Sequence, residues 1–224
     1  MFSESLIRLK EKNLMREIKN RNSPQGTRIV IDGKEYINFS SNNYLGLANH
    51  PHVIESSRKA IAAFGFGSGA SRLLCGGSVF HDELEKKTAE FKGTEAALIF
   101  NSGYSANTGI IPAIADEGDV IFSDELNHAS IVDGCRLSKA KKIIYRHKDI
   151  GHLSELIEKE TAKRKIIITD SVFSMDGDIA PLKELYDICL TLNAQRSTLN
   201  VFLYIDDAHG TGVLGNGKGA LAHF

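Results

Sequence analysis

The stretch VFLYIDDAHGTG, residues 201–212, decides the fold of this chain. Its first five residues are apolar and predict a buried β-strand, which stops at Asp206 and Asp207 and is followed by His209. In open α/β sheets, ligands bind beyond the carboxyl ends of parallel strands. A carboxylate at such an edge needs a cationic or proton-donating partner, and a protonated heterocycle nitrogen is one. Taken alone, the stretch fits equally well an aspartate that caps a helix and a histidine that only packs.

Composition sets the class of protein. The 224 residues are 42% hydrophobic and 25% charged, which is typical of one large soluble domain or most of one. The chain has 27 lysines and arginines and 28 aspartates and glutamates, and this near balance argues against a nucleic-acid-binding surface. No apolar run approaches membrane-spanning length, and the charged N-terminus is not a secretory signal. The cysteines at 75, 135 and 189 are odd in number and dispersed, so we expect buried free thiols in the cytoplasm and no metal site.

The first part of the chain is predicted to be an arm. Apolar residues on one face predict a helix over about 3–19, and the Asp32-Gly33 turn between residues 28–31 and 35–39 predicts a β-hairpin. We therefore divide the chain into an arm, 1–47, and a larger domain, 48–224. A helix is expected at 51–64. The glycine-rich stretch 65–77 follows that helix and lacks a GK[ST] ending, so it is interpreted as sharply bent backbone near a ligand and not as a phosphate loop.

Helices and strands alternate in the rest of the chain. Short apolar runs predict strands at 96–100, 120–123, 142–145 and 165–170, in addition to 201–205. Helices are predicted at 82–92, from Ser102 to about 115, at 150–164 and at 181–193. Each strand is followed by polar residues. This pattern is typical of an α/β fold with a buried, mostly parallel sheet whose strand ends line a site.

Four strand ends offer related chemistry: Ser102-Gly103-Tyr104, His128, Ser174, and Asp206 with His209. The helix that starts after Ser102 would bind a phosphate, because its first N–H groups are unpaired. A histidine could stack on a ring, a hydroxyl and an imidazole could bond a phenolic oxygen, and a carboxylate could keep a ring nitrogen protonated. Together these groups suit a planar, phosphorylated cofactor that contains nitrogen.

Seven segments carry a family resemblance: NFSSNNYLGL, GSGASRLLCGG, HDELE, FNSGYSAN, DELNHASIVDG, VFSMDGDIAPL and IDDAHGTGVLG, which run from about Asn38 to Gly219. In content and order they resemble the α-oxoamine synthases, which are pyridoxal-phosphate enzymes of the aspartate-aminotransferase fold type. The resemblance implies a three-layer α-β-α large domain with a mostly parallel central sheet, here incomplete. It also implies a homodimer with sites at the interface.

The resemblance implies decarboxylative condensation of an amino acid with an acyl thioester. GSGASR and VFSMDGDIAPL are most similar to the branch that makes 8-amino-7-oxononanoate for biotin from L-alanine and pimeloyl-CoA or pimeloyl-carrier protein. The alternative is the glycine C-acetyltransferase (2-amino-3-ketobutyrate CoA ligase) branch, whose pattern Cys75 fits. A transaminase or lyase of another pyridoxal-phosphate class would match only the Asp206–His209 end.

Residue roles follow from the same resemblance. Ser102, Gly103 and Tyr104 would hold the phosphate. His128 would stack on the pyridine ring, Asp206 would bind the ring nitrogen, and His209 with Ser174 would contact the phenolic oxygen. The expected catalytic residues are His128, Asp206 and His209. Asn42 and Arg16 match substrate-side positions. Arg72 either binds a carboxylate or braces the glycine-rich stretch, whereas Asp207 is interpreted as structural and His81 as a helix-start residue.

The family also needs a lysine that forms a Schiff base with the cofactor, on a later strand end beyond His209. No lysine here matches that motif, because Lys218 belongs to the loop directly after the Asp206–His209 end. The resemblance therefore implies the N-terminal portion of such an enzyme, poorly stable and inactive alone. A truncated, non-catalytic partner subunit is the alternative.

Overall fold

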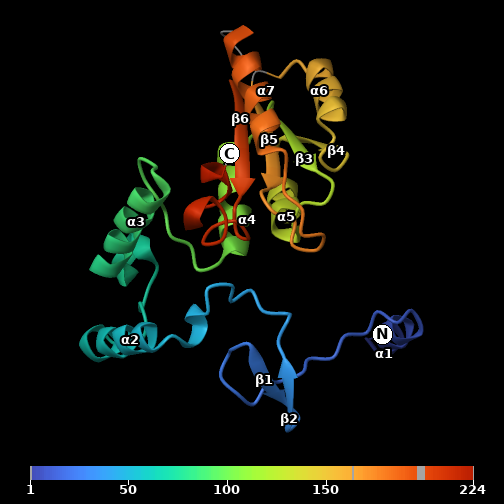
Figure 1. Cartoon of the computed structure of the whole chain (residues 1–224). Coiled ribbons are helices and arrows are strands. Elements are labelled where there is room, and N and C mark those ends of the chain that lie inside the picture. The colour runs from blue at the N-terminus through green and yellow to red at the C-terminus, as the bar shows by residue number, and fades with distance from the viewer. Residues whose placement is uncertain (1, 163, 196–199, 224) are drawn as a thin grey trace. The chain divides into compact units, whose positions relative to one another are not determined.

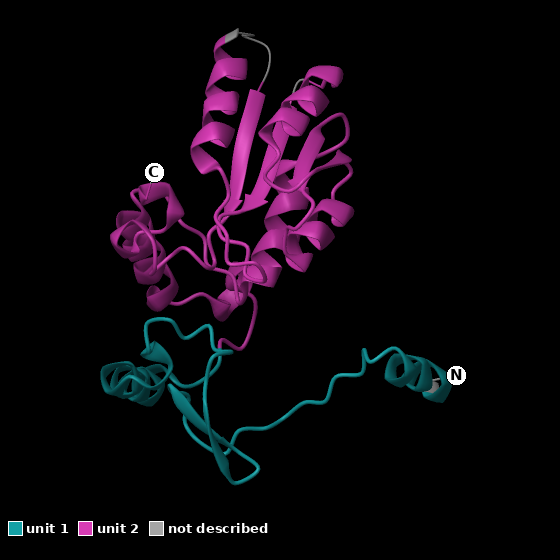
Figure 2. Cartoon of the chain, turned by 45° about the vertical axis from the view of Figure 1, so that its right-hand side comes forward, with its two compact units in different colours: residues 1–67 teal, residues 68–224 magenta. Residues whose placement is uncertain are grey.

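The computed structural model describes residues 2–162, 164–195 and 200–223. By contacts between residues, the chain divides into two compact units, Met1–Gly67 and Ser68–Phe224, coloured teal and magenta in Figure 2. The expected domain boundary between residues 47 and 48 lies inside the first unit and stays a prediction.

The first unit contains a helix, a hairpin and a second helix. Its elements are α1 Phe2–Glu11, β1 Arg28–Ile31, β2 Lys34–Ile37, a short 3₁₀ helix Leu47–Asn49, and α2 Pro51–Phe64. The predicted hairpin is confirmed: β1 and β2 are antiparallel, and Asp32 and Gly33 have φ of 51° and 74°, which are typical of a two-residue hairpin turn. The helix expected at 51–64 is confirmed with the same bounds.

The helix expected over 3–19 is too long. Asn13 adopts a left-handed φ of 55°, and the Leu14 N–H bonds the Leu9 carbonyl at 2.8 Å, a hydrogen-bond pattern that terminates helices. Leu14 and Ile18 consequently lie outside α1, with 60% and 93% of their surface exposed. The amphipathic pattern was present in the sequence, but the left-handed asparagine ends the helix before the pattern does.

The second unit opens with a tight turn. The glycine-rich stretch contains a π-helical turn, Arg72–Gly76, followed by α3 Val79–Lys92. A Cβ at Gly76 would lie 1.8 Å from the Ala70 carbonyl oxygen, so only glycine allows this sharp bend. His81 lies in the first turn of α3, where its ring bonds the Ser78 cap, as expected for a helix-start residue.

The central sheet has four parallel strands, which confirms the predicted α/β class. They are β3 Val120–Asp124, β4 Lys141–Tyr145, β5 Arg164–Asp170 and β6 Asn200–Asp206, in the order β4-β3-β5-β6. The strand predicted at 96–100 is wrong. No described strand pairs with that segment, and the N–H of Ile99 donates instead to a carboxylate oxygen of Glu85 at 2.9 Å. An apolar run without a neighbouring strand cannot form a ladder.

Helices cover both faces of the sheet (Figure 1). α4 Gly103–Ile114 and α5 Ala129–Leu137 pack on one face, and α6 Ile150–Lys159 and α7 Leu182–Gln195 on the other. Along β5, Ile166 and Ile168 join the α4–α5 core while Ile167 joins the α6–α7 core, as the alternation of side chains along a strand requires. The layers are therefore α, β and α.

Two helix predictions need correction here. The sequence analysis did not predict α5. It also extended α6 to residue 164, whereas α6 ends at Lys159. Lys165 already belongs to β5, and its buried ammonium bonds the carbonyl oxygens of Ile157 and Glu160 at 2.8 and 2.7 Å. That side chain thus binds carbonyl oxygens at the C-terminal end of the helix.

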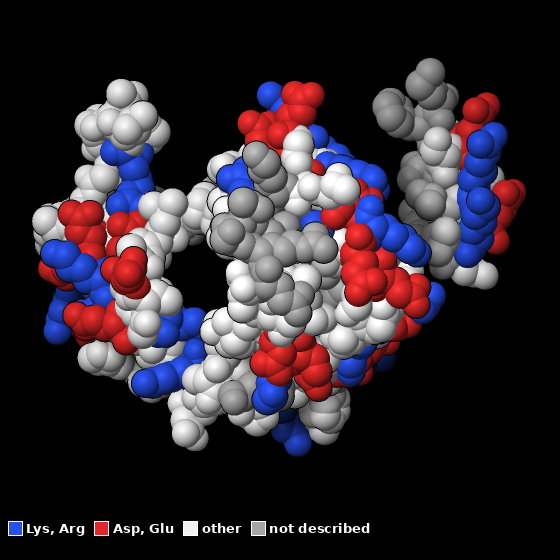
Figure 3. All heavy atoms as spheres, turned by 90° about the horizontal axis from the view of Figure 1, so that it is seen from above, with Lys and Arg blue, Asp and Glu red and all other residues white. Residues whose placement is uncertain are grey.

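The surface carries charges of both signs, and two of the cysteines are buried. In Figure 3, acidic and basic side chains are intermingled on the face in view. None of the described helices is long and apolar enough to span a membrane. Cys135 and Cys189 are buried free thiols, and burial raises the pKa of each to about 11. Cys75 is exposed, contrary to expectation, because it lies in the tight turn outside the core.

Candidate functional site

Three aspartates end three neighbouring strands. Asp124, Asp170 and Asp206 are the last residues of β3, β5 and β6, and Asp170 pairs in register with Asp206. Because the strands are parallel and adjacent, the carboxylates lie along one edge of the sheet. Carboxylates gathered at one edge require donors from the surrounding elements.

A buried asparagine fixes the orientation of the Asp206 carboxylate. Asn107, in α4, is 3% exposed, and its Nδ2 donates to Asp206 Oδ2 at 2.7 Å and to Ser130 Oγ at 2.9 Å. Its Oδ1 accepts from the Tyr204 hydroxyl at 2.7 Å. The other oxygen of Asp206 accepts the N–H of Ala208 at 3.0 Å. Burial, and after it the charge of Asp206, raises the pKa of Tyr204 to about 12, so the phenol stays a donor.

The same network reaches His128. His128 is the N-cap of α5, and its Nδ1 accepts the N–H of Ser130 at 3.2 Å and lies 2.7 Å from Ser130 Oγ. Because Nδ1 accepts, the neutral ring carries its proton on Nε2. A continuous chain of hydrogen bonds thus connects Asp206, Asn107, Ser130 and His128, and two of the predicted site residues are joined by two that were not predicted.

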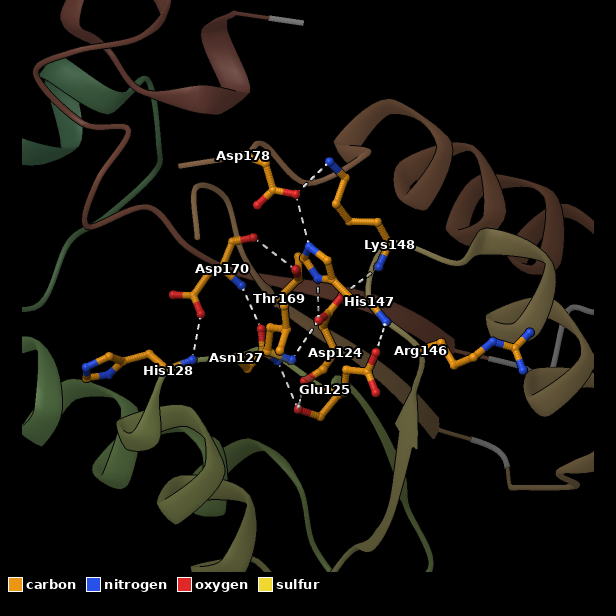
Figure 4. A network of polar contacts seen from close by, with 12 residues as sticks. Asp124, Glu125, Asn127, His128, Arg146, His147, Lys148, Thr169, Asp170 and Asp178 are labelled. Carbon is orange, nitrogen blue, oxygen red and sulfur yellow. Dashed lines mark hydrogen bonds and ion pairs between the residues drawn. The ribbon is translucent and has the colours of Figure 1, made fainter. Parts of the chain in front are cut away.

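The Asp170 carboxylate binds the backbone at the start of α5. Its Oδ2 accepts the N–H of His128 at 2.7 Å, and its own N–H donates to Asn127 Oδ1 at 2.9 Å. Asn127 Nδ2 in turn donates to Ser123 Oγ and to the Ile168 carbonyl, as Figure 4 shows in part. Burial raises the pKa of Asp170 to about 6, although the N–H of His128 opposes the shift. The carboxyl therefore takes up a proton at a higher pH than an exposed aspartate does.

Ser174 lies close to His128. Both line a cavity of about 200 Å³ between the start of α5 and the segment after β5, whose other lining residues are Leu126, Asn127, Ala129, Asp170, Phe173, Met175 and Asp176. The structure therefore brings Ser174 and His128 together around one space at the carboxyl edge of the sheet.

The N-terminus of α4 is open. Ser102 caps the helix, accepting the N–H of Ser105 at 3.1 Å, and a Cβ built on Gly103 would meet nothing within 4 Å. Gly103 and Asn107 are four positions apart, about 6 Å along the helix axis. Tyr104 donates its hydroxyl to Asp133 at 2.5 Å, a bond that raises the pKa of Tyr104. Free N–H groups at this end favour an anion.

The loop after β6 carries the other predicted residues. His209 is half-buried in it. Asp207 accepts from Ser171 at 2.8 Å, from Lys92 at 3.0 Å and from Thr211 at 2.7 Å, contacts that agree with a structural role. These bonds fasten the loop to the C-terminal end of α3 and to the segment after β5.

Arg72 braces the glycine-rich turn. Its guanidinium bonds both carboxylate oxygens of Glu85 in α3 and lies 3.7 Å from Asp82. The hydrogen bond from Arg72 lowers the pKa of Glu85 to about 2. Of the two readings, the structure therefore favours the bracing one.

Arg16 and Asn42 lie in the first unit, so their role toward the strand ends stays a prediction. The side chain of Asn42 accepts the Tyr44 hydroxyl at 3.3 Å, and Arg16 is exposed in the segment after α1. Sequence reasoning missed Asn107, Ser130 and Asp170. The signal for Asn107 was its position one turn after Gly103, as an amide in a helix that ends in apolar residues.

Comparison with known proteins identifies the family. The model of aminotransferase class I and II matches residues 34–223. The chain belongs to this family. A protein of Thermodesulfovibrio yellowstonii is 59% identical over 224 residues, which are 100% of this chain and 56% of that protein. The 8-amino-7-oxononanoate synthase of Geobacter metallireducens is 52% identical over 98% of this chain and 55% of its own length. The chain thus spans about half the length of the curated relatives it matches.

Solved structures agree with the family assignment. A serine palmitoyltransferase of S. paucimobilis, solved with bound PLP and myriocin, matches 99% of this chain and 55% of that chain, with a TM-score of 0.88 and 31% identity. The 8-amino-7-oxononanoate synthase of Francisella tularensis matches 83% of this chain and 49% of that chain, with a TM-score of 0.66 and 31% identity. The three-layer fold described above is the fold of these enzymes.

Proposed function

We propose that this chain is part of a pyridoxal-phosphate-dependent acyltransferase that condenses L-alanine with pimeloyl-CoA or pimeloyl-carrier protein. The reaction would release CO₂ and form 8-amino-7-oxononanoate for biotin synthesis. The observation that carries the proposal is the Asp206 carboxylate, fixed by the buried Asn107 and connected through Ser130 to His128. The name of the Geobacter relative supports the choice of reaction.

The described residues fit this cofactor. The open start of α4 at Ser102 and Gly103 offers free N–H groups to a phosphate, and the Asp206 carboxylate lies about one helical turn further along α4. Tyr104 would flank the phosphate end, since its hydroxyl is tied to Asp133 on α5. An anion site and a carboxylate at this spacing suit a molecule with a phosphate at one end and a basic ring nitrogen at the other.

Each residue then has a defined task. Bound pyridoxal phosphate supplies an electron sink when the carboxyl group of the amino acid leaves as CO₂. Asp206 would keep the ring nitrogen protonated, because a carboxylate within hydrogen-bond distance favours the charged form. Asn107 holds that carboxylate in place. His128 would cover one face of the ring, and Ser174 and His209 would donate to the phenolic oxygen.

The substrate side and the assembly extend the proposal. Asn42 and Arg16 would contact substrate, and the enzyme would be a cytoplasmic homodimer. No lysine of this chain would form the Schiff base. Lys92, the lysine tied to the loop that carries His209, already donates to Asp207, Thr211 and the carbonyl of Lys218.

Two measurements test the proposal. The full-length protein that contains this chain is assayed for release of free CoA with L-alanine and pimeloyl-CoA, and in parallel with glycine and acetyl-CoA. Release of CO₂ is measured as well and is expected only with L-alanine and pimeloyl-CoA, because 2-amino-3-ketobutyrate retains the carboxyl group of glycine. Asp206→Asn should lower kcat about a hundredfold, and the surface control Asp187→Asn should not. Faster turnover of glycine and acetyl-CoA would favour the acetyltransferase, and activity with neither pair would refute an acyltransferase.

Borohydride reduction in the presence of pyridoxal phosphate tests the lysine. We expect no single lysine among these 224 residues to be labelled. Specific labelling of one of them would show that the Schiff-base residue lies in this chain.

A further inference from the structure

His147 lies between two carboxylates that come from different elements. Its Nδ1 is 2.9 Å from Asp124 Oδ1 at the end of β3, and its Nε2 is 3.0 Å from Asp178 Oδ2 in the segment after β5 (Figure 4). An ionised carboxylate only accepts hydrogen bonds, so both ring nitrogens must carry a proton. This geometry requires an imidazolium. Burial lowers the pKa of His147, but the bonds to the two carboxylates outweigh it, and the net shift is upward from 6.5.

The groups around the ring favour its positive charge. Asp124 faces it from β3, and Glu125, the next residue, accepts the backbone N–H of His147 at 2.8 Å. Asp178 faces it from the segment after β5 and also accepts from Lys148 at 2.9 Å. The negative charges of these three carboxylates are partly balanced by the positive charges of the imidazolium and the Lys148 ammonium. The nearby Arg146 pairs with Asp149 instead.

The same ring packs against the turn that carries Ser174. His147 and Phe173 meet edge to face, with ring centroids 4.4 Å apart and an interplanar angle of 89°. Phe173 and Asp178 close that turn: the N–H of Phe173 bonds the carbonyl of Asp178 at 3.0 Å, and the N–H of Gly177 bonds the carbonyl of Phe173 at 2.7 Å. His147 therefore touches both residues at the base of the turn, and Ser174 follows directly after one of them.

We propose that His147 is a positioning residue: as an imidazolium between Asp124 and Asp178, it holds the 173–178 turn and so places Ser174 at the cavity beside His128. The inference rests on the proposed function, in which Ser174 contacts the cofactor. His147 does not line that cavity and acts only through the turn.

This arrangement makes the position of Ser174 dependent on pH. A neutral imidazole has one N–H and must give up one of its two carboxylates. The folded-state pKa of His147 is raised, so the tether is fully present below 6.5 and is lost as the pH rises through the folded value. Where the imidazole gives up Asp178, this carboxylate would keep its bond to the Lys148 ammonium. The other oxygen of Asp178, Oδ1, is already buried without a hydrogen-bond partner among the described residues.

Amide hydrogen exchange of the protein at about pH 6 and about pH 9 tests the tether directly. Protection of the Phe173 and Gly177 amides, corrected for intrinsic exchange, should fall about tenfold between these values. In His147→Phe, which keeps an aromatic ring but no donor, protection should be low at both. His152→Gln is the matched control, because the His152 ring bonds the Arg146 N–H and lies outside the bridge. Equal, pH-independent protection in wild type and His147→Phe would overturn the proposal.

Two further readouts keep the test decisive. NMR of the wild-type imidazole should show both nitrogens of His147 protonated at about pH 6, a result that does not depend on whether His147→Phe folds. A singly protonated ring at this pH would overturn the proposal. When the pH is raised from about 6 to about 9, the affinity for pyridoxal phosphate should fall about tenfold more in the wild type than in His147→Phe. An identical pH dependence would refute the positioning role alone, whereas no binding at any pH would refute the proposed function and leave the exchange result standing.

Discussion

The substitution Asn107→Asp should make the stability of the fold depend on pH. The Asn107 amide nitrogen donates to Asp206 at 2.7 Å and to Ser130 at 2.9 Å. In the variant a carboxylate oxygen takes that place and faces the Asp206 carboxylate, while the Tyr204 hydroxyl keeps its acceptor. One isosteric change therefore replaces an attraction with a repulsion at a buried position.

The size of the effect follows from two limits. Two unit charges about 4 Å apart at an effective dielectric constant of about 20 repel by about 4 kcal/mol. Protonation of one of the two carboxyls removes the repulsion and therefore sets an upper limit to the cost. For a carboxyl with an ordinary pKa of about 4, protonation costs about 4 kcal/mol at pH 7 and about 1.4 kcal/mol less for each pH unit below pH 7. We expect a loss of about 4 kcal/mol at pH 7 and about 1.5 kcal/mol near pH 5, where the two carboxyls share a proton.

Urea denaturation followed by circular dichroism at about pH 5, 6 and 7 measures this loss. Asn107→Ala is the control, because it removes the same hydrogen bonds without adding charge and should cost about 2 kcal/mol at every pH. If Asn107→Asp costs no more than Asn107→Ala, and equally at each pH, the amide does not orient Asp206 as described.

Three further predictions concern other parts of the same unit. Asp170→Asn should raise the free energy of unfolding by about 3 kcal/mol above pH 6 and by little below pH 4, because burial raises the pKa of this acid from 3.8 to about 6 and its ionised form therefore destabilises the fold. Urea titrations of both proteins across this pH range measure the difference in stability. A difference that does not change with pH would contradict the prediction. Gly134→Ala should lower the melting temperature, at a cost of about 1–3 kcal/mol in the free energy of unfolding, because the new Cβ would lie 2.6 Å from a backbone oxygen of α4. In the control Gly103→Ala the new Cβ meets no atom within 4 Å, so this variant should weaken only phosphate binding. Equal melting temperatures of the two variants would refute the close crossing of α4 and α5. Asp207→Ala removes the carboxylate that pairs with the partly buried Lys92 ammonium, which keeps its bonds to Thr211 and to the Lys218 carbonyl, and should cost about 2 kcal/mol at pH 7. Burial raises the pKa of Asp207, but the hydrogen bonds that it accepts outweigh burial and lower the pKa, so the cost should shrink as the pH falls below 3.8. A chemical-denaturation series that shows no loss at pH 7 would contradict this role of Asp207.

The strands could be predicted where burial alone decides them. β3, β5 and β6 lie within a residue or two of the expected ranges, since each is an apolar run that ends at an aspartate. The segment 96–100 has the same apolar character but forms no strand. A strand depends on a neighbour that may be distant in sequence, and periodicity contains no information about that neighbour.

The candidate site could be predicted only in part, for a related reason. Asp206 and His128 stand at element ends, where polar residues break an apolar pattern and attract attention. Asn107 and Ser130 lie within helices, and their importance comes from the close approach of α4 to α5, at which a Cβ on Gly134 would meet the Asn107 carbonyl at 2.6 Å. Such contacts depend on tertiary packing and cannot be read from local spacing.

The hydrogen bond between Asn107 and Asp206 also has a consequence in time. The two residues are 99 positions apart in the chain, so at a synthesis rate of about 5–20 residues per second Asn107 leaves the ribosome about 5–20 s before its partner. Throughout that interval Asn107 lacks the Asp206 carboxylate, and its amide must stay hydrated or bind other partners. The polar junction therefore closes late, when β6 docks beside β5, and nascent chains pass through a stage in which the sheet lacks this edge.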